Sequence, residues 1–466
     1  MELVRETGPS KKGLAALLVA SVLLGTLSLT FQYFLPVSLL QIVAAGLGAA
    51  VVGFLIFAYP KYGLLGAVFY IYADLTFIFK MHLSYPIVVI VALAVLFRLL
   101  RGDELRGPSR EFSGTVALFT LLALGSMLFS HDVGQSMAGF SQHVKVIVMV
   151  YLVVQLLRTP DDLDLFALVI FLGSIASIIL GVLAIIVVGL AEVDVSAIGQ
   201  YGGIIRFGGT HPNANAAAVY MISALPMGAY LMIRQRRMLY RVAIGLGILV
   251  LFAGAVFTFS RQGIFSLVFI VAAILVREAR SRKIYVTAFI TVFISILLTP
   301  SLYWMRILSI GDYLAGRSTD WSIMLRITAL KKAWSLFLEN PLTGVGMNNF
   351  VVRAGSDLFV KIGPHNMYLE ILVGMGVVGF LSFLAVHFSA YRAFRRVMRG
   401  RSDRNDRVGR FAFYLLLAYL ATLISGMFQS ITFYYLVWLP VAGGLAVDRI
   451  ARGAGENPAS VKLNTP

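Results

Sequence analysis

Long uncharged apolar stretches recur along this 466-residue chain and constrain its fold more than any other feature. About 20 such residues are enough for an α-helix to cross a membrane. A helix also satisfies its own backbone hydrogen bonds there, so we expect an all-α polytopic transmembrane bundle of about 12–14 spans. The predicted spans are 13–31, 35–58, 62–79, 83–100, 112–129, 139–157, 164–190, 213–233, 241–259, 263–277, 284–300, 366–390, 411–428 and 430–447.

Composition agrees with a membrane protein. Hydrophobic residues make up 59% of the chain and charged residues only 13%, which excludes an ordinary soluble domain. The first apolar stretch is of spanning length and lacks a small-residue cleavage site, so we interpret it as a transmembrane helix rather than a cleavable signal. The chain has no cysteine, which excludes disulfides and thiol chemistry.

Basic residues predict the orientation. With the amino terminus in the cytoplasm, most of the 39 lysines and arginines fall in inner segments, as the positive-inside rule requires. The net charge of +17 therefore indicates topology and contact with anionic membrane lipids rather than nucleic acid. We interpret the eight arginines between Arg392 and Arg410 as a plain cytoplasmic anchor.

Loop lengths divide the chain into four parts. Residues 1–300 hold transmembrane helices 1–11 with short loops, 301–365 form a large periplasmic loop, 366–447 hold the C-terminal spans, and 448–466 form a cytoplasmic tail. Long loops in compact folds are usually functional. Apolar residues at helical spacing predict an amphipathic helix within the large loop: Ile323, Ile327, Leu330, Trp334 and Phe337. The helix can lie at the membrane interface, and two interpretations stay open: Arg326 binds a ligand, or the helix is only a lid packed on the bundle.

The sequence Gly363-Pro364-His365-Asn366 opens a predicted span that contains Gly376 and Gly379. Ionisable groups at such positions are costly and usually functional. The positive pole of the helix disfavours the imidazolium, so we expect a neutral His365 that can act as a general base. The alternative is a helix-entry histidine that hydrogen-bonds a loop carbonyl.

Two further arginines fall on the same predicted outer face. Arg206 lies in a glycine-rich loop before the span at 213–233, and Arg261 lies in the turn between two spans. A guanidinium forks onto two oxygens and suits a phosphate or diphosphate. The alternative for each arginine is contact with lipid phosphate. Weaker candidates at this face are His143, Lys145, His211, Gln262, Asn213, Tyr368 and Glu370.

Metal and nucleotide chemistry have little support. The acidic pairs at 162–164 and 192–194 lack a histidine or glycine frame, and we interpret both as solvated turns. The chain has no Walker loop and no zinc-helix histidine pair, so we predict neither a metal nor a cofactor.

Four motifs together resemble the O-antigen ligase and polymerase superfamily of bacterial envelope proteins. They are Arg206-Phe207-Gly208 with Pro212-Asn213, Ser260-Arg261-Gln262-Gly263, Pro341-Leu342-Thr343-Gly344-Val345-Gly346, and His365-Asn366 with Gly376 and Gly379. The resemblance covers roughly residues 112–447. It implies a glycosyltransferase of the membrane C type in the bacterial inner membrane, active in lipopolysaccharide biosynthesis with its site facing the periplasm.

The same resemblance implies an undecaprenyl-diphosphate-linked glycan as donor and a lipid A core or glycan as acceptor, without metal or ATP. Combined with the residue chemistry, it predicts His365 as base, with Asn366 orienting the ring or the substrate. Arg206 and Arg261 would bind the diphosphate, with Arg326, Gln262, Asn213 and Tyr368 as further substrate contacts. Two alternatives remain: an O-antigen or exopolysaccharide polymerase of the same superfamily, and a lipid-linked glycan transporter.

Overall fold

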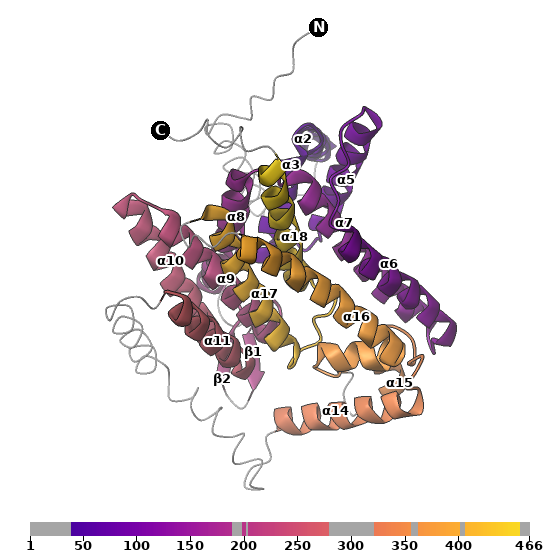
Figure 1. Ribbon diagram of the computed structural model, residues 1–466. Coiled ribbons are helices and arrows are strands. Elements are labelled where there is room, and N and C mark those ends of the chain that lie inside the picture. The colour runs from indigo at the N-terminus through magenta and orange to yellow at the C-terminus, as the bar shows by residue number, and fades with distance from the viewer. Residues whose placement is uncertain are drawn as a thin grey trace.

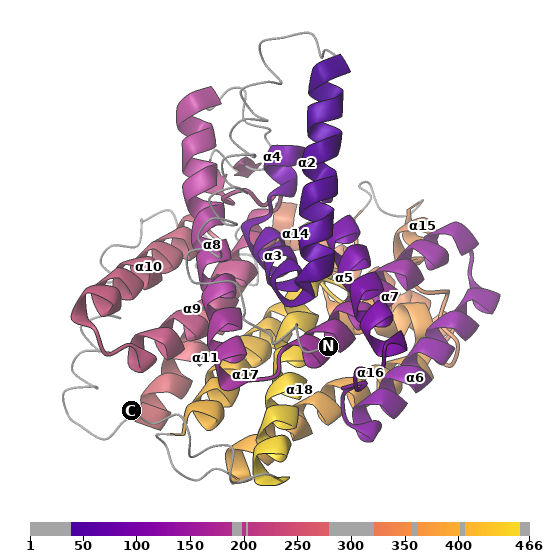
Figure 2. The same cartoon turned by 90° about the horizontal axis from the view of Figure 1, so that it is seen from above.

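The computed structural model describes residues 39–188, 198–201, 204–278, 321–355, 362–400 and 406–456. Figures 1 and 2 show a bundle of packed helices in two views. The elements are α2 (Leu39–Ala58), α3 (Pro60–Ala73), α4 (Thr76–Phe79), α5 (Ser84–Leu100), α6 (Arg110–Gly125), the 3₁₀ turn η1 (Ser126–Phe129), α7 (Val133–Leu156), α8 (Pro160–Val188), β1 (Ile198–Tyr201), β2 (Ile204–Phe207), α9 (Ala214–Arg234), α10 (Met238–Phe257), α11 (Arg261–Glu278), α14 (Trp321–Glu339), α15 (Phe350–Ala354), α16 (Met367–Gly400), α17 (Arg407–Gly426) and α18 (Tyr435–Glu456).

The predicted spans correspond to helices wherever the structure describes them, and the spans at 13–31 and 284–300 lie outside the described residues. Seven described helices are long and apolar enough to cross a membrane: α6 with η1, α7, α8, α9, α10, α16 and α17. The helices α2 and α3 bend by 116° at Tyr59–Pro60 and add an eighth if they form one broken span. Pro60 begins α3 because proline suits a first helical turn and cannot continue the preceding helix.

Burial separates central from peripheral helices. The apolar window of α9 is 83% buried and that of α17 is 72% buried, against 28% for α6 and for α10. Leucines on the outer helices are exposed, with Leu121 at 66% and Leu249 at 59%. This pattern fits a bundle whose periphery faces lipid, because lipid tails accept apolar side chains as readily as a protein core does.

The only described strands form a short antiparallel ribbon, in which Gly199 of β1 pairs with Arg206 of β2. Strand β2 packs against α10. The fold class is all-α, and the ribbon belongs to the connection between α8 and α9.

A break in α16 departs from the continuous helix that we predicted. Gly376 has φ 65° and ψ −171°, and Val377 N–H donates to Pro341 O at 2.8 Å instead of to its own helix. A Cβ at Gly376 would lie 2.2 Å from Leu342 O. The Pro341–Gly346 motif therefore packs against α16 where glycine allows the closest backbone approach.

The predicted helix is confirmed by α14, which ends at Glu339 before Asn340-Pro341, but its buried residues are not those of the predicted apolar stripe. Its packed face consists of Ala329, Ala333 and Leu336, which join a small core with Val373 of α16. Trp334, which belongs to the predicted apolar stripe, is 51% exposed. The small alanines allow close packing on α16 and leave larger apolar side chains on the surface.

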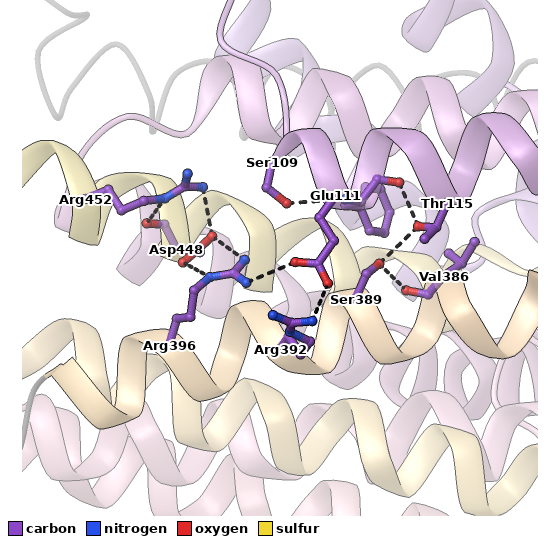
Figure 3. A network of polar contacts seen from close by, with 10 residues as sticks. Ser109, Glu111, Thr115, Val386, Ser389, Arg392, Arg396, Asp448 and Arg452 are labelled. Atoms are coloured by element: carbon purple, nitrogen blue, oxygen red, sulfur yellow. Dashed lines mark hydrogen bonds and ion pairs between the residues drawn. The ribbon is translucent and has the colours of Figure 1, made fainter.

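Ion pairs concentrate at the end of the bundle where α16 and α18 finish, which we call the Asp448 end. Asp448 is 1% exposed, and its carboxylate accepts hydrogen bonds from Arg396 at 3.0 Å and Arg452 at 2.8 Å. Glu111 of α6 lies 3.1 Å from Arg392, as Figure 3 shows. The interpretation of the Arg392–Arg410 run as a plain anchor was therefore incomplete, because these arginines tie three helices together.

The acidic pair at 162–164 is not a solvated turn. Asp162 is buried and lies 2.8 Å from Lys61 of α3, and its other oxygen accepts the backbone N–H of Thr159 at 2.9 Å. Asp164 lies 2.7 Å from Arg407 of α17. Both carboxylates join helices at the Asp448 end. The pair at 192–194 lies outside the described residues.

Candidate functional site

Arg206 is held in a fixed position at the opposite end of the bundle, which we call the His365 end. Its side chain is buried, Nε donates to Thr258 O at 2.8 Å, and Nη2 donates to Asn215 Oδ1 at 2.7 Å. Thr258 follows α10 and Asn215 lies in the first turn of α9. The structure thus orients the guanidinium between two helix ends.

Asn215 also connects Arg206 to the motif that contains Arg261. Its Oδ1 accepts from Ser260 Oγ at 3.0 Å, and its backbone carbonyl accepts from Gln262 Nε2 at 3.0 Å. Arg261, between these two residues, is half-buried and begins α11. The predicted Arg206 and Arg261 motifs, far apart in sequence, therefore meet at one asparagine.

A short segment joins these residues to the beginning of α16. Gln262 Nε2 donates to Gln429 Oε1 at 2.7 Å, and Gln429 lies between α17 and α18. We call residues 427–434 the α17–α18 turn. At its start, Met427 O accepts from Asn366 Nδ2 at 3.0 Å. The turn therefore contacts both the arginine motifs and the residue after His365.

His365 combines backbone strain with an electrostatic environment that keeps it neutral. Its φ of 49° is left-handed, a conformation that histidine adopts more readily than most residues but still at a cost. Burial, and next the positive charge of Arg326 on α14, lower the pKa of His365 from 6.5 to about 4. The ring is therefore neutral near pH 7, as we expected, although burial and Arg326, rather than the helix dipole, are the causes. A neutral imidazole has one nitrogen that can accept a proton.

Three predicted site residues have structural contacts. Asn366 caps α16, because its Oδ1 accepts the backbone N–H groups of Tyr368 and Leu369, each at 3.0 Å. Asn213 caps α9 in the same way, with a 2.8 Å bond from Asn215 N–H. Tyr368 donates its hydroxyl to Leu423 O on α17 at 3.0 Å. These contacts fix the helix ends around the candidate site.

The weaker candidates are dispersed. His143 is fully buried in α7, where Thr120 Oγ1 lies 2.8 Å from Nε2, and Lys145 lies over the ring of Tyr85. His211 lies 3.2 Å from Asp74. Glu370 accepts from the Thr432 hydroxyl in the α17–α18 turn and lines a small cavity. Of these residues, Glu370 hydrogen-bonds to the α17–α18 turn, and the His143 ring lies edge-on to Phe433 of the same turn.

Asn215 and Gln429 were not predicted from the sequence. Asn215 follows the predicted Asn213 by two residues, and a polar residue in a first helical turn is easily taken for a surface position. Gln429 lies in the polar break between the predicted spans 411–428 and 430–447. The sequence feature that could have indicated Gln429 is its position: it is an amide in a short connection on the same predicted outer face as the motif residues.

The chemistry of this end suits hydroxyls and anions. It presents guanidinium, amide, hydroxyl and imidazole groups from α9, α11, α14, α16 and the α17–α18 turn. Within the described parts of the chain, no three histidine, cysteine, aspartate or glutamate side chains form a group suited to a metal ion.

Residues 246–384 match the family model described as O-Antigen ligase. The matched segment contains the Ser260–Gly263 motif, the Pro341–Gly346 motif and His365, whereas Arg206 precedes it. No curated protein matches the chain.

Proposed function

We propose that this chain, whose residues 246–384 match the O-antigen ligase family model, transfers a glycan from undecaprenyl diphosphate to a lipid A core sugar. The observation that supports this proposal best is the contact path between Arg206 and the beginning of α16. It runs through Asn215, Gln262 and the α17–α18 turn, so the arginine that we propose to bind the diphosphate shares one end of the bundle with a neutral histidine.

In the proposed reaction, Arg206 and Arg261 bind the diphosphate and stabilise the charge that develops as it leaves. A hydroxyl oxygen of the acceptor attacks the anomeric carbon of the donor sugar from the opposite side. The bond from that carbon to the phosphate oxygen breaks, and its electron pair leaves with the diphosphate. His365 takes the hydroxyl proton, so the reaction inverts the configuration and requires neither metal nor ATP.

Arg326 has an electrostatic part in this mechanism. Its charge favours the neutral form of His365 before the reaction, and a guanidinium also attracts the anionic donor. Asn366 positions His365 through the cap of α16 and the bond to Met427 O. Both contributions depend on α14 and the α17–α18 turn lying against the first turn of α16.

Purified protein in vesicles tests the proposal directly. With an undecaprenyl-diphosphate-linked glycan and a lipid A core acceptor, we expect a product larger than the acceptor by one glycan, with or without a chelator. Mass spectrometry of the extracted lipids measures this change. If the wild-type protein transfers the glycan to neither lipid A core nor a second glycan, the proposal is wrong.

The exposed apolar side chains of α14 favour a ligase over a polymerase. Trp334 and Leu338 are 51% and 59% exposed, which suits a helix at the interface where it meets a membrane-anchored acceptor. Gene deletion separates the two reactions. Loss of a ligase leaves bare lipid A core, whereas core carrying a single repeat would identify a polymerase.

We further propose an inner-membrane location with the His365 end in the periplasm. Because the chain lacks cysteine, single cysteines at the exposed Val133 and Leu105 report on opposite ends. An impermeant thiol reagent should label Val133→Cys in cells with a permeabilised outer membrane and leave Leu105→Cys unlabelled. The reverse pattern would contradict the orientation.

A further inference from the structure

Some enclosed polar atoms at the His365 end have no hydrogen-bond partner among the residues that the structure describes, and two of them belong to uncharged side chains that lie close to the arginine motifs and to His365. These two atoms are Oε1 of Gln262 and Oγ of Ser430. Gln262 is only 3% exposed, and its Nε2 donates to both Asn215 O and Gln429 Oε1, which fixes the amide so that Oε1 is the remaining acceptor. Unsatisfied buried polar atoms are rare and costly, so they call for a specific explanation.

Their location indicates what they could bind. Gln262 follows Arg261 directly and shares Asn215 with Arg206. Ser430 follows Gln429 and lies against the segment before His365, since a Cβ at Gly363 would be 3.3 Å from Ser430 Oγ. The two atoms therefore lie on the contact path between the arginine motifs and the histidine.

We propose that Gln262 Oε1 and Ser430 Oγ form a subsite for the hydroxyl groups of the sugar attached directly to the donor diphosphate. This inference rests on the proposed function, because that sugar must lie between the leaving phosphate and the base. Its hydroxyls can donate to the glutamine oxygen and exchange hydrogen bonds with the serine. The subsite therefore recognises a polyhydroxylated ring rather than the lipid or the phosphates.

Ser430→Ala is the most direct test. A vesicle-based binding assay would compare undecaprenyl diphosphate carrying one sugar with undecaprenyl diphosphate alone. The variant should bind the sugar-bearing lipid about 10-fold more weakly and the sugar-free lipid as well as wild type, as expected for one lost hydrogen bond. Its melting temperature should be unchanged or higher, because the substitution removes an unsatisfied hydroxyl.

Ser266→Ala is the matched control. Ser266 Oγ lies 2.9 Å from Ser425 Oγ, so this pair also joins α11 to α17, with both hydroxyls fully buried. Removing a satisfied hydroxyl should lower the melting temperature and leave the binding of both lipids unchanged. The two serine substitutions thus have opposite expected effects on stability and on sugar binding.

Gln262→Met provides a second variant of nearly the same length, and it should likewise weaken binding of the sugar-bearing lipid. Arg206→Lys should weaken the binding of both lipids. A wild-type preference for the sugar-bearing lipid that survives Ser430→Ala and Gln262→Met would overturn the subsite alone. Failure of the wild-type protein to bind either lipid would overturn the proposed function and the subsite together.

Discussion

At the Asp448 end, the buried carboxylate of Asp448 accepts hydrogen bonds from two arginines, and Asp162 pairs with Lys61. At the His365 end, by contrast, Gln262 Oε1 and Ser430 Oγ have no partner among the described residues, and His365 has a strained backbone. The carboxylates at the Asp448 end are thus paired with cations, whereas the two polar atoms at the His365 end can still accept hydrogen bonds from a ligand.

This difference separates stabilising polar groups from functional ones. A buried charge without a partner is strongly unfavourable, so the ion pairs at the Asp448 end are best explained as contacts that hold the helices together. Strain and unsatisfied polar groups cluster where a protein binds or transforms a ligand. Substitutions at the Asp448 end should therefore change stability, and those at the His365 end should change transfer.

The largest expected effect is at His365. His365→Asn keeps a residue type that tolerates the left-handed conformation but removes the proton acceptor, so transfer should fall by about 100-fold or more without a change in melting temperature. His131→Asn, at an exposed histidine near the same end, is the control and should match wild type. A His365→Asn protein with wild-type transfer would exclude His365 as the base.

The next largest effect is expected at the arginines. Lysine keeps the charge but loses the forked geometry, so Arg206→Lys and Arg261→Lys should each reduce transfer by about 10-fold or more. Arg241→Lys, at an exposed arginine far from these motifs, should have no effect. Full activity of both motif variants would favour contact with lipid phosphate over diphosphate binding.

At the Asp448 end we expect an effect on stability. Asp448→Asn removes the negative charge that pairs with Arg396 and Arg452. The side chains of these two arginines are 38% and 53% exposed. The free energy of unfolding should fall by about 1–3 kcal/mol, since partial exposure of the arginines weakens the pairing. Thermal melting measures this loss. Reduced transfer by the folded variant at unchanged stability would contradict the division between the two ends.

A smaller effect concerns pH. His365 must be neutral to accept a proton, and its pKa is about 4, so transfer should rise as pH increases through that value and then level off. Arg326→Gln removes a positive charge and should raise the pKa, which moves the acidic limb to higher pH. Burial, the larger cause, remains, so the limb should stay below 6.5. An unchanged limb would mean that the charge of Arg326 does not act on His365.

The smallest expected effect is at the surface of α14. Trp334→Gln should reduce transfer to a membrane-anchored acceptor by about threefold or less, because the tryptophan would contribute interfacial contact rather than chemistry. A water-soluble acceptor analogue should be used equally well by the variant and the wild type. Equal losses with both acceptors would point to a packing defect in α14.

Local patterns in the sequence were enough to predict the helices. Apolar stretches gave their approximate positions, and helical spacing gave α14, because hydrophobicity and periodicity act within a few turns of chain. Motif residues also indicated which end of the bundle could hold chemistry. The break at Gly376 was not predicted, since it depends on Leu342 O approaching the backbone of α16.

Tertiary structure alone brought the candidate site together. The bond between Gln262 and Gln429 joins residues 167 positions apart, and Arg326 affects His365 from a different helix. No local pattern encodes such contacts, because they depend on how the helices pack. The sequence by itself determined a helical membrane bundle with polar motifs at one end. Packing decided which of those polar groups satisfy one another and which are left with capacity for a ligand.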